Sequence, residues 1–217
     1  MPSETAPVLY VIGAGGHGRE LSSYFEDLRR WGWPGEVRGY LDDRLPAGRH
    51  GRINVLGPID TLEHLCGFYI TAFGSNALRR GVVDRLTTRY RTGLRPWTLI
   101  HPRSCIGEDV EIGDGTCIAP GAILTAQIAV GRHCIVNVNA SVSHDCMIGD
   151  FVNLNPGAIL CGAVTIGEGA FIGAGAVLRE RVSIGAWSLV GAGAVVACDV
   201  PPEVTVVGVP ARPIRQS

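Results

Sequence analysis

A six-residue repeat in the second half of the chain constrains the fold more than any other feature. From Ile106 to Val196 every sixth residue is Ile, Leu or Val, sixteen positions in succession without a change of register. This period matches neither the 3.6 residues of an α-helix nor the two-residue alternation of a strand. It is typical of a parallel β-helix, in which three short strands form each 18-residue coil. Residues 99–217 are therefore predicted to form an all-β parallel β-helix domain.

Two further positions of the repeat carry small residues. Cys134 and Cys146 lie two residues before an aliphatic position, a place that alanine fills in other coils, so we expect both to be small buried packing residues. Glycine follows the aliphatic residue once per coil, and we expect it to turn a corner with positive φ. These glycines are Gly113, Gly131, Gly149, Gly167 and Gly185.

The first 98 residues alternate between strand-like and helix-like segments. Short apolar runs bounded by glycine or aspartate predict strands, and apolar residues at helical spacing predict helices. The expected strands are 9–12, 37–41 and 68–73, the expected helices are 19–30 and 77–91, and 45–52 is expected to be a loop. This alternation predicts an α/β domain, residues 1–98, that holds half of a Rossmann fold.

A glycine-rich segment joins the first expected strand to the first expected helix. Residues 13–18 fit the pattern GxGxxG, and Asp42 follows about twenty residues later. In this context backbone N–H groups and the helix N-terminus favour a pyrophosphate, and the acid binds a ribose hydroxyl. A tight turn without a ligand is the alternative. Because half a Rossmann fold leaves no catalytic partner domain, a nucleotide diphosphate fits better than a redox cofactor, and His17 is a further donor to it.

His144 and Asp145 are the candidate catalytic residues of the repeat domain. His144 lies two residues after the aliphatic Val142, outside the inward positions, so it should project from a corner next to a carboxylate. An imidazole so placed is a suitable general base at neutral pH. The alternatives are a solvated surface histidine or a nucleophilic Cys146, although the cysteine position points into the core. His133 has no adjacent acid, and we expect it to be a solvated surface residue.

Composition narrows the remaining function classes. The formal net charge is −1, which gives no electrostatic reason to expect nucleic acid or a membrane surface as a partner. The seven cysteines include no CxxC pair, and an odd number fits reduced thiols better than a disulfide framework. The N-terminus resembles no signal peptide and no run approaches 18 apolar residues, so we expect a cytoplasmic protein.

Taken together, the motifs carry a resemblance over nearly the whole chain. The chain resembles the bacterial sugar O-/N-acyltransferases of the left-handed β-helix superfamily, in particular the nucleotide-sugar N-acetyltransferases such as PglD and the perosamine and viosamine enzymes. It is also similar to the sialic acid O-acetyltransferases. The resemblance rests on residues 12–18, 40–43, 73–76, 101–102, 143–149, 155–157 and 207–213, and on Asn137.

This resemblance implies left-handed coils, a homotrimer, and acetyl-CoA as co-substrate in the groove between neighbouring prisms. It implies that His144 is the base, that Asp145 supports it, and that Asn137 lies near the reacting amine. The nucleotide of the sugar substrate is expected at Gly15, Gly16, His17, Asp42, Asp43 and Gly74. Acetyl-CoA is expected to contact Asn153, Gly162, Ala174 and Ala192.

Position 153 departs from the family pattern. Many members have a second histidine there, near the thioester carbonyl, whereas this chain has Asn153. An asparagine can donate a hydrogen bond to that oxygen, but it excludes a role that needs a titratable group.

The resulting prediction is acetyl-CoA-dependent N-acetylation of a nucleotide-linked amino-deoxy sugar, without a metal or a covalent intermediate. One alternative is O-acetylation of a sialic acid or related sugar on the same scaffold. A free sialic acid needs no nucleotide site, so affinity for a nucleotide diphosphate separates the two. The other alternative is a non-catalytic trimer that binds nucleotide sugars, which the absence of acetyl-CoA binding would favour.

Overall fold

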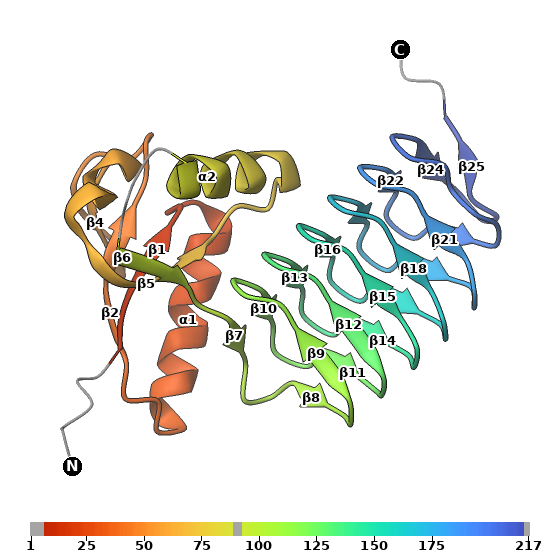
Figure 1. Ribbon diagram of the computed structural model, residues 1–217, viewed down its shortest axis with the longest axis horizontal. Coiled ribbons are helices and arrows are strands. Elements are labelled where there is room, and N and C mark those ends of the chain that lie inside the picture. The colour runs from red at the N-terminus through yellow and green to blue at the C-terminus, as the bar shows by residue number, and fades with distance from the viewer. Residues whose placement is uncertain (1–6, 89–92, 215–217) are drawn as a thin grey trace. The chain divides into compact units, whose positions relative to one another are not determined.

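The computed structural model of the protein describes residues 7–88 and 93–214. The chain forms two compact units that meet between Trp97 and Thr98. Each has its own sheets and its own apolar core (Figure 1). Within the described ranges, no helix combines the length and the apolar character needed to cross a membrane.

Unit 1 is an α/β domain built on one six-stranded sheet, as predicted. The strands are β1 (Val8–Ile12), β2 (Glu36–Leu41), β3 (Gly48–His50), β4 (Ile53–Gly57), β5 (Cys66–Thr71) and β6 (Gly93–Pro96). They follow the order β3-β4-β2-β1-β5-β6, and every pair is parallel except β3 with β4. The helices are α1 (Gly16–Arg30), the 3₁₀ helix η1 (Ile59–His64) and α2 (Asn76–Thr88).

Two aspects of unit 1 differ from the prediction. The expected loop 45–52 contains β3, which forms an antiparallel hairpin with β4. The edge strand β6 and helix η1 were not predicted, because both are short and lack a clear apolar period. The predicted helix 77–91 is α2, which the structure describes through Thr88, and its predicted end falls among residues 89–92, outside the described residues.

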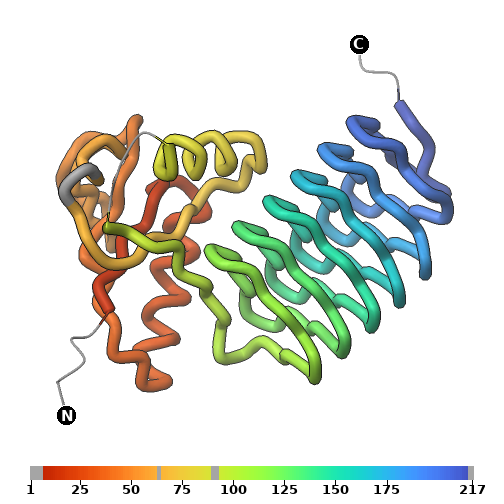
Figure 2. The backbone as a smooth tube through the Cα atoms, in the orientation of Figure 1, coloured from red at the N-terminus to blue at the C-terminus, as the bar shows by residue number. Residues whose placement is uncertain are grey.

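Unit 2 is a left-handed parallel β-helix with three flat faces, as predicted. Figure 2 shows its successive coils stacked along one axis. Face 1 contains β7 (Leu99–Ile100), β10 (Cys117–Ile118), β13 (Ile135–Val136), β16 (Asn153–Leu154), β19 (Phe171–Ile172), β22 (Leu189–Val190), β24 (Thr205–Val207) and β25 (Arg212–Pro213). Face 2 contains β8 (Cys105–Ile106), β11 (Ile123–Leu124), β14 (Ser141–Val142), β17 (Ile159–Leu160), β20 (Val177–Leu178) and β23 (Val195–Val196). Face 3 contains β9 (Val110–Ile112), β12 (Ile128–Val130), β15 (Met147–Ile148), β18 (Thr165–Ile166) and β21 (Ser183–Ile184).

The repeated aliphatic residues form the core of unit 2. From Ile118 onward every one of them is buried, while Ile106 and Ile112 in the first coil are partly buried. The small residues two positions earlier are also buried, including Cys134 and Cys146 at 1% and 0% exposure. The coils are held together by parallel pairing between residues 18 apart, so each aliphatic side chain lies directly over its equivalent in the preceding coil.

The prediction that glycines after the aliphatic residues have positive φ is wrong. Positive φ occurs three residues after each aliphatic position from Ile106 to Val190, at every sixth residue from Asp109 to Gly193. The glycines at 113, 131, 149, 167 and 185 are needed for close approach instead. A Cβ on Gly167, for example, would lie 2.5 Å from the backbone nitrogen of Ala186 in the next coil. Glycine at this position therefore sets the spacing between coils.

This distinction predicts different costs for two glycine substitutions. Gly167→Ala should destabilise the protein by about 2–3 kcal/mol, because the methyl group would overlap backbone of the next coil. Gly175→Ala should cost only about 1 kcal/mol, since its φ of 65° is strained for alanine but the space beside it is open. Chemical denaturation of the two variants measures both values. A Gly167→Ala variant as stable as Gly175→Ala would contradict the close-approach explanation.

Candidate functional site

The predicted nucleotide-binding residues line one cavity of about 760 Å³ in unit 1. The cavity lies where β1, β2 and β5 end, and its wall is formed by the segments that follow these parallel strands. Here the chain order reverses about β1, with β2 on one side and β5 on the other, which is where open α/β sheets bind ligands. All six residues assigned to the nucleotide from the resemblance are among the lining residues: Gly15, Gly16, His17, Asp42, Asp43 and Gly74.

The glycines in the turn between β1 and α1 are required for different structural reasons. Gly13 has a φ of 104°, and a Cβ on Gly18 would lie 2.4 Å from the carbonyl oxygen of Gly13, so both are needed to pack the helix against the turn. Gly15 and Gly16 have no atom within 4 Å of an added Cβ, so they keep the entrance of the cavity open. Gly15 caps α1 without a side-chain hydrogen bond, and the first turn has no acidic residue. The positive end of the helix dipole is thus available to an anion.

Asp42 and Asp43 are fixed by contacts within unit 1. Asp42 accepts backbone hydrogen bonds from Ala14 at 2.7 Å, Arg44 at 2.8 Å and Leu45 at 3.0 Å. Burial acts to raise the pKa of Asp42, but these three hydrogen bonds and the charge of Arg44 outweigh it and lower the pKa. Asp43 accepts from the backbone of Ile59 at 2.9 Å. Both carboxylates therefore hold the loop in place, and each keeps lone pairs for a ligand.

His17 lines the cavity and uses one ring nitrogen to bond to the next turn of α1. Its Nδ1 lies 2.9 Å from Oε2 of Glu20, and the hydrogen bond from His17 lowers the pKa of Glu20. The side chain is only 10% exposed, and Nε2 has no hydrogen-bond partner within the part of the chain that the structure describes. A buried ring nitrogen left in this way at a cavity is available to a polar ligand.

Two arginines that sequence reasoning missed support the cavity. Arg79 is buried, at 1% exposure, and its guanidinium donates to the carbonyl of Phe73 at 2.8 Å. Arg85 bonds to Asp43 at 2.9 Å and to Asp60, which ties α2 to the loops after β2 and β4. Arg79 could have been found from its place on the buried stripe of α2, where charged residues are rare. No local pattern indicates the partners of Arg85, because they are distant in sequence.

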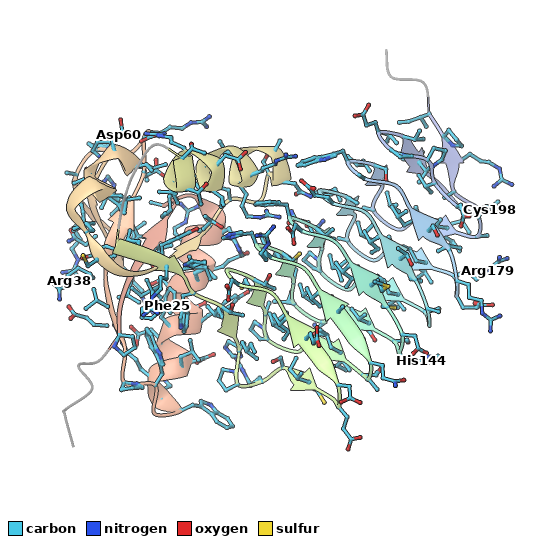
Figure 3. The ribbon with its side chains drawn as sticks, in the orientation of Figure 1. Phe25, Arg38, Asp60, His144, Arg179 and Cys198 are labelled. Atoms are coloured by element: carbon cyan, nitrogen blue, oxygen red, sulfur yellow. The ribbon has the colours of Figure 1, made fainter. Side chains whose placement is uncertain are left out.

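His144 and Asp145 form an exposed pair at a corner of unit 2. They make the turn between β14 and β15, and Figure 3 shows His144 at the outer edge of the coils. His144 Nδ1 lies 2.7 Å from Oδ2 of Asp145, and the side chains are 65% and 52% exposed. Because the carboxylate can only accept, Nδ1 carries the proton and Nε2 is left free to accept one. The arrangement predicted from the sequence is therefore present, and it suits general-base catalysis.

The backbone of this turn is held by its neighbours in both directions. Asp145, at a φ of 61°, donates its N–H to the carbonyl of Ala126 in the preceding coil at 3.2 Å. The carbonyl of His144 accepts the N–H of Ala163 in the following coil at 2.8 Å. The position of the imidazole is thus limited mainly by its own side-chain torsions.

Cys146 is not arranged as a nucleophile. Its thiol is buried and donates to the carbonyl of Cys161 at 3.3 Å, and burial raises its pKa. Both effects disfavour the thiolate that nucleophilic attack requires. In the described ranges, no group of three or more His, Cys, Asp or Glu side chains is placed to hold a metal ion.

The expectation that His133 is a solvated surface residue is wrong. Its residue exposure is 5%, and its ring stacks on Phe151 with centroids 5.4 Å apart. The ring also fills the space over Gly115 of the preceding coil, where an added Cβ would lie 2.2 Å from Nδ1. His133 is thus part of the packing at the corner between faces 3 and 1, because residues 18 apart stack at each corner.

The residues assigned to acetyl-CoA do not share one corner. Ala174 and Ala192 are exposed and follow β19 and β22, so they stack at the corner between faces 1 and 2. Gly162 follows β17 and lies at the corner of His144, between faces 2 and 3. Asn153 lies within β16 on face 1 and is 3% exposed. Asn137 follows β13 on the same face, and its side-chain oxygen accepts the N–H of Val138 at 2.7 Å.

Comparison with known proteins identifies both units. The family model of the PglD N-terminal domain matches residues 8–86, and the bacterial transferase hexapeptide model, which spans six repeats, matches residues 163–198. Among curated protein sequences none matches significantly.

Solved structures match over the whole chain. The acetyltransferase domain of PglB from Neisseria gonorrhoeae is 35% identical, with a TM-score of 0.87, and the match covers 96% of this chain and 100% of that one. A second structure of that domain contains acetyl coenzyme A. A histidine-to-asparagine mutant of perosamine N-acetyltransferase from Caulobacter crescentus, in complex with CoA and GDP-perosamine, is 31% identical, with a TM-score of 0.86 and coverage of 98% and 99%. WeeI from Acinetobacter baumannii is also 31% identical, with a TM-score of 0.85 and coverage of 95% and 99%. The chain therefore belongs to the hexapeptide-repeat sugar acyltransferases of the left-handed β-helix superfamily that carry a PglD-type N-terminal domain.

Proposed function

We propose that the protein transfers the acetyl group of acetyl-CoA to the amino group of a nucleotide-linked amino-deoxy sugar, such as a 4-amino-4,6-dideoxyhexose. The observation that carries this proposal is the exposed His144–Asp145 pair, a base with a free Nε2 at a corner of an acyltransferase fold. The similarity to a perosamine N-acetyltransferase, whose structure contains CoA and GDP-perosamine, supports both the acyl donor and the sugar class.

The cavity of unit 1 supports a nucleotide diphosphate as the part of the substrate that this unit binds. Its volume of about 760 Å³ is within the range of small-molecule sites. The N-terminus of α1 offers partial positive charge and backbone donors to phosphate oxygens at one side, and His17 in the same lining has an Nε2 without a partner among the described residues. Asp42 and Asp43 lie on the wall of the same cavity and offer acceptors to ribose or base. We assign Gly15, Gly16 and Gly74 to the backbone contacts, since each lacks a side chain that would block approach.

The proposed reaction is a direct acyl transfer. The amine nitrogen attacks the thioester carbonyl carbon while His144 Nε2 accepts a proton from that nitrogen, and Asp145 stabilises the resulting imidazolium. The tetrahedral intermediate then collapses, the carbon–sulfur bond breaks, and the CoA thiolate takes the proton from His144. Backbone N–H groups and Asn153 are assigned to the oxyanion, a contribution of about 3 kcal/mol per donor in other acyl-transfer enzymes. Asn137 is assigned to the amine, and Ala174 and Ala192 to acetyl-CoA.

An exposed apolar column on face 2 supports assembly into a homotrimer. The outward side chains of Ile123 and Ile159 are 44% and 43% exposed, with Ser141 between them in the intervening coil, and the partly buried Val177 and Val195 continue the column in later coils. Apolar columns of this kind favour contact with another copy, and closed rotational symmetry would repeat the contact three times.

Replacing the base should remove most activity. His144→Ala should lower turnover by about 10²–10⁴-fold at pH 7, the usual effect of losing a positioned base. Asp145→Asn should cost less, because it weakens support for the imidazolium and asparagine tolerates the positive φ. Both losses should persist as pH rises, since the neutral fraction of the amine increases equally for the wild type and the variants. A thiol-release assay from pH 6 to 9 measures this, and near wild-type turnover of His144→Ala throughout would refute the assignment.

A substitution in the nucleotide cavity should weaken binding of the nucleotide sugar without weakening binding of acetyl-CoA. Asp42→Ala should weaken binding of the nucleotide sugar about ten-fold or more, because it removes an ionised acceptor and three loop contacts. Acetyl-CoA affinity, measured by calorimetry, should stay within two-fold of wild type. Asp84→Ala is the matched control, since Asp84 is an exposed carboxylate outside the cavity lining. Equal loss of both ligands would contradict the division between the units.

The assembly should depend on the face 2 column. Sedimentation velocity should give a trimer for the wild type at micromolar concentration and monomers for Ile123→Arg combined with Ile159→Arg, because charges there would be buried unpaired. Trp31→Arg, at an exposed apolar residue of unit 1, should remain trimeric. A monomeric wild type would refute the proposal.

The central test of substrate class is a thermal-shift screen of UDP, GDP and dTDP, followed by thiol release with matching amino sugars. Nucleotide binding, turnover and an amide product identified by mass spectrometry are the expected results. Turnover of a free sialic acid without nucleotide affinity would favour O-acetylation instead. Nucleotide binding without any acetyl-CoA binding would favour a non-catalytic trimer.

A further inference from the structure

We propose that Gly162 is a positioning residue for the catalytic imidazole: its missing side chain provides the space in which the His144 ring lies while bonded to Asp145. This inference rests on the proposed function, since it concerns the proposed base. It differs from the acetyl-CoA contact that the family resemblance assigns to Gly162.

The imidazole occupies the space that a side chain at position 162 would need. A Cβ built on Gly162 would lie 2.6 Å from Cε1, 2.7 Å from Nε2 and 3.3 Å from Nδ1 of His144. These are the three atoms nearest to that Cβ, and all of them belong to the ring. A methyl group at 162 would therefore collide first with the catalytic side chain.

The backbone gives no other reason for glycine at this position. The residue with positive φ in this turn is Ala163, at 58°, and Gly162 is not among the positive-φ glycines. Gly115, Gly121 and Gly169 likewise leave space for a side chain of an adjacent coil, in their case the following one, but their φ values of 75°, 72° and 66° already favour glycine. The contact with the His144 ring is therefore the remaining explanation, among contacts within the protein, for glycine at position 162.

A methyl group at 162 should move the ring and leave the backbone in place. The carbonyls of His144 and Gly162 accept N–H groups of the following coils, from Ala163 at 2.8 Å and from Arg181 at 3.0 Å. The imidazole, in contrast, is held by a single 2.7 Å hydrogen bond to Asp145. Rotating the ring away from 162 breaks or distorts this bond and displaces Nε2 from the amine.

The test is the kinetics of Gly162→Ala in the full-length protein. We expect kcat to fall about 10–100-fold, because small misplacements of reacting groups have effects of this size. The KM for acetyl-CoA and the melting temperature should stay near wild-type values. Ala129→Ser is the matched control: it adds one heavy atom at an exposed residue of β12 in the preceding coil, and kcat should be retained. A raised KM for acetyl-CoA with unchanged kcat would overturn the proposal in favour of a cofactor contact.

A double-mutant cycle separates this inference from the proposed function. If Gly162 acts through His144, Gly162→Ala should cause no further loss of kcat in the His144→Ala background. Additive losses would overturn the positioning role. Full activity of Gly162→Ala, while His144→Ala is impaired, would also overturn it but leave His144 as the base. Full activity of His144→Ala would instead refute the proposed function.

Discussion

The left-handed backbone residue at every sixth position is the constraint on which unit 2 depends. It turns the chain at each corner, so the strands stay short and residues 18 apart are superimposed. Several corner residues are not glycine, and a non-glycine residue in this conformation costs about 1–2 kcal/mol. Hydrogen bonds between coils, such as that from Asp145 N–H to Ala126, offset this cost. Once the turn is fixed, sequence number alone determines which corner or face a side chain occupies.

The position of the proposed catalytic pair, His144 and Asp145, follows from this geometry. His144 and Asp145 are the two exposed residues of the turn between β14 and β15. Contacts between equivalent turn residues of successive coils occur elsewhere as well: Arg132 bonds to Asp150, 18 residues later, through its backbone N–H at 2.7 Å and its guanidinium. The same relation places Gly162 beside His144. The position of a histidine side chain at a corner therefore depends on the residue 18 positions away as much as on its sequence neighbour.

The sequence predicted the parts of the structure that depend on burial or on local pattern. The inward aliphatic residues, the glycine-rich turn and the exposed His144 were all predictable, because each follows from one segment's own periodicity. The reason for glycine at position 167 was not predictable, because both a positive φ and a close approach of backbone require glycine. His133 was misjudged because its burial depends on stacking with Phe151 in another coil. Similarly, the bonds of Arg85 to Asp43 and Asp60 join segments that no local pattern connects.

The solvent exposure of the proposed catalytic pair limits how strongly Asp145 can stabilise a protonated His144. With side chains 65% and 52% exposed, water screens the interaction between His144 and Asp145, and an exposed pair of this kind contributes only about 0–1 kcal/mol. Excluding water would strengthen the same 2.7 Å contact several-fold, because the effective dielectric constant falls. Acetyl-CoA, the sugar and a neighbouring copy are the groups proposed to cover this corner. If His144 is the base, as proposed, the pair holds it in position in the free subunit, and the electrostatic support of Asp145 increases only when the corner is covered.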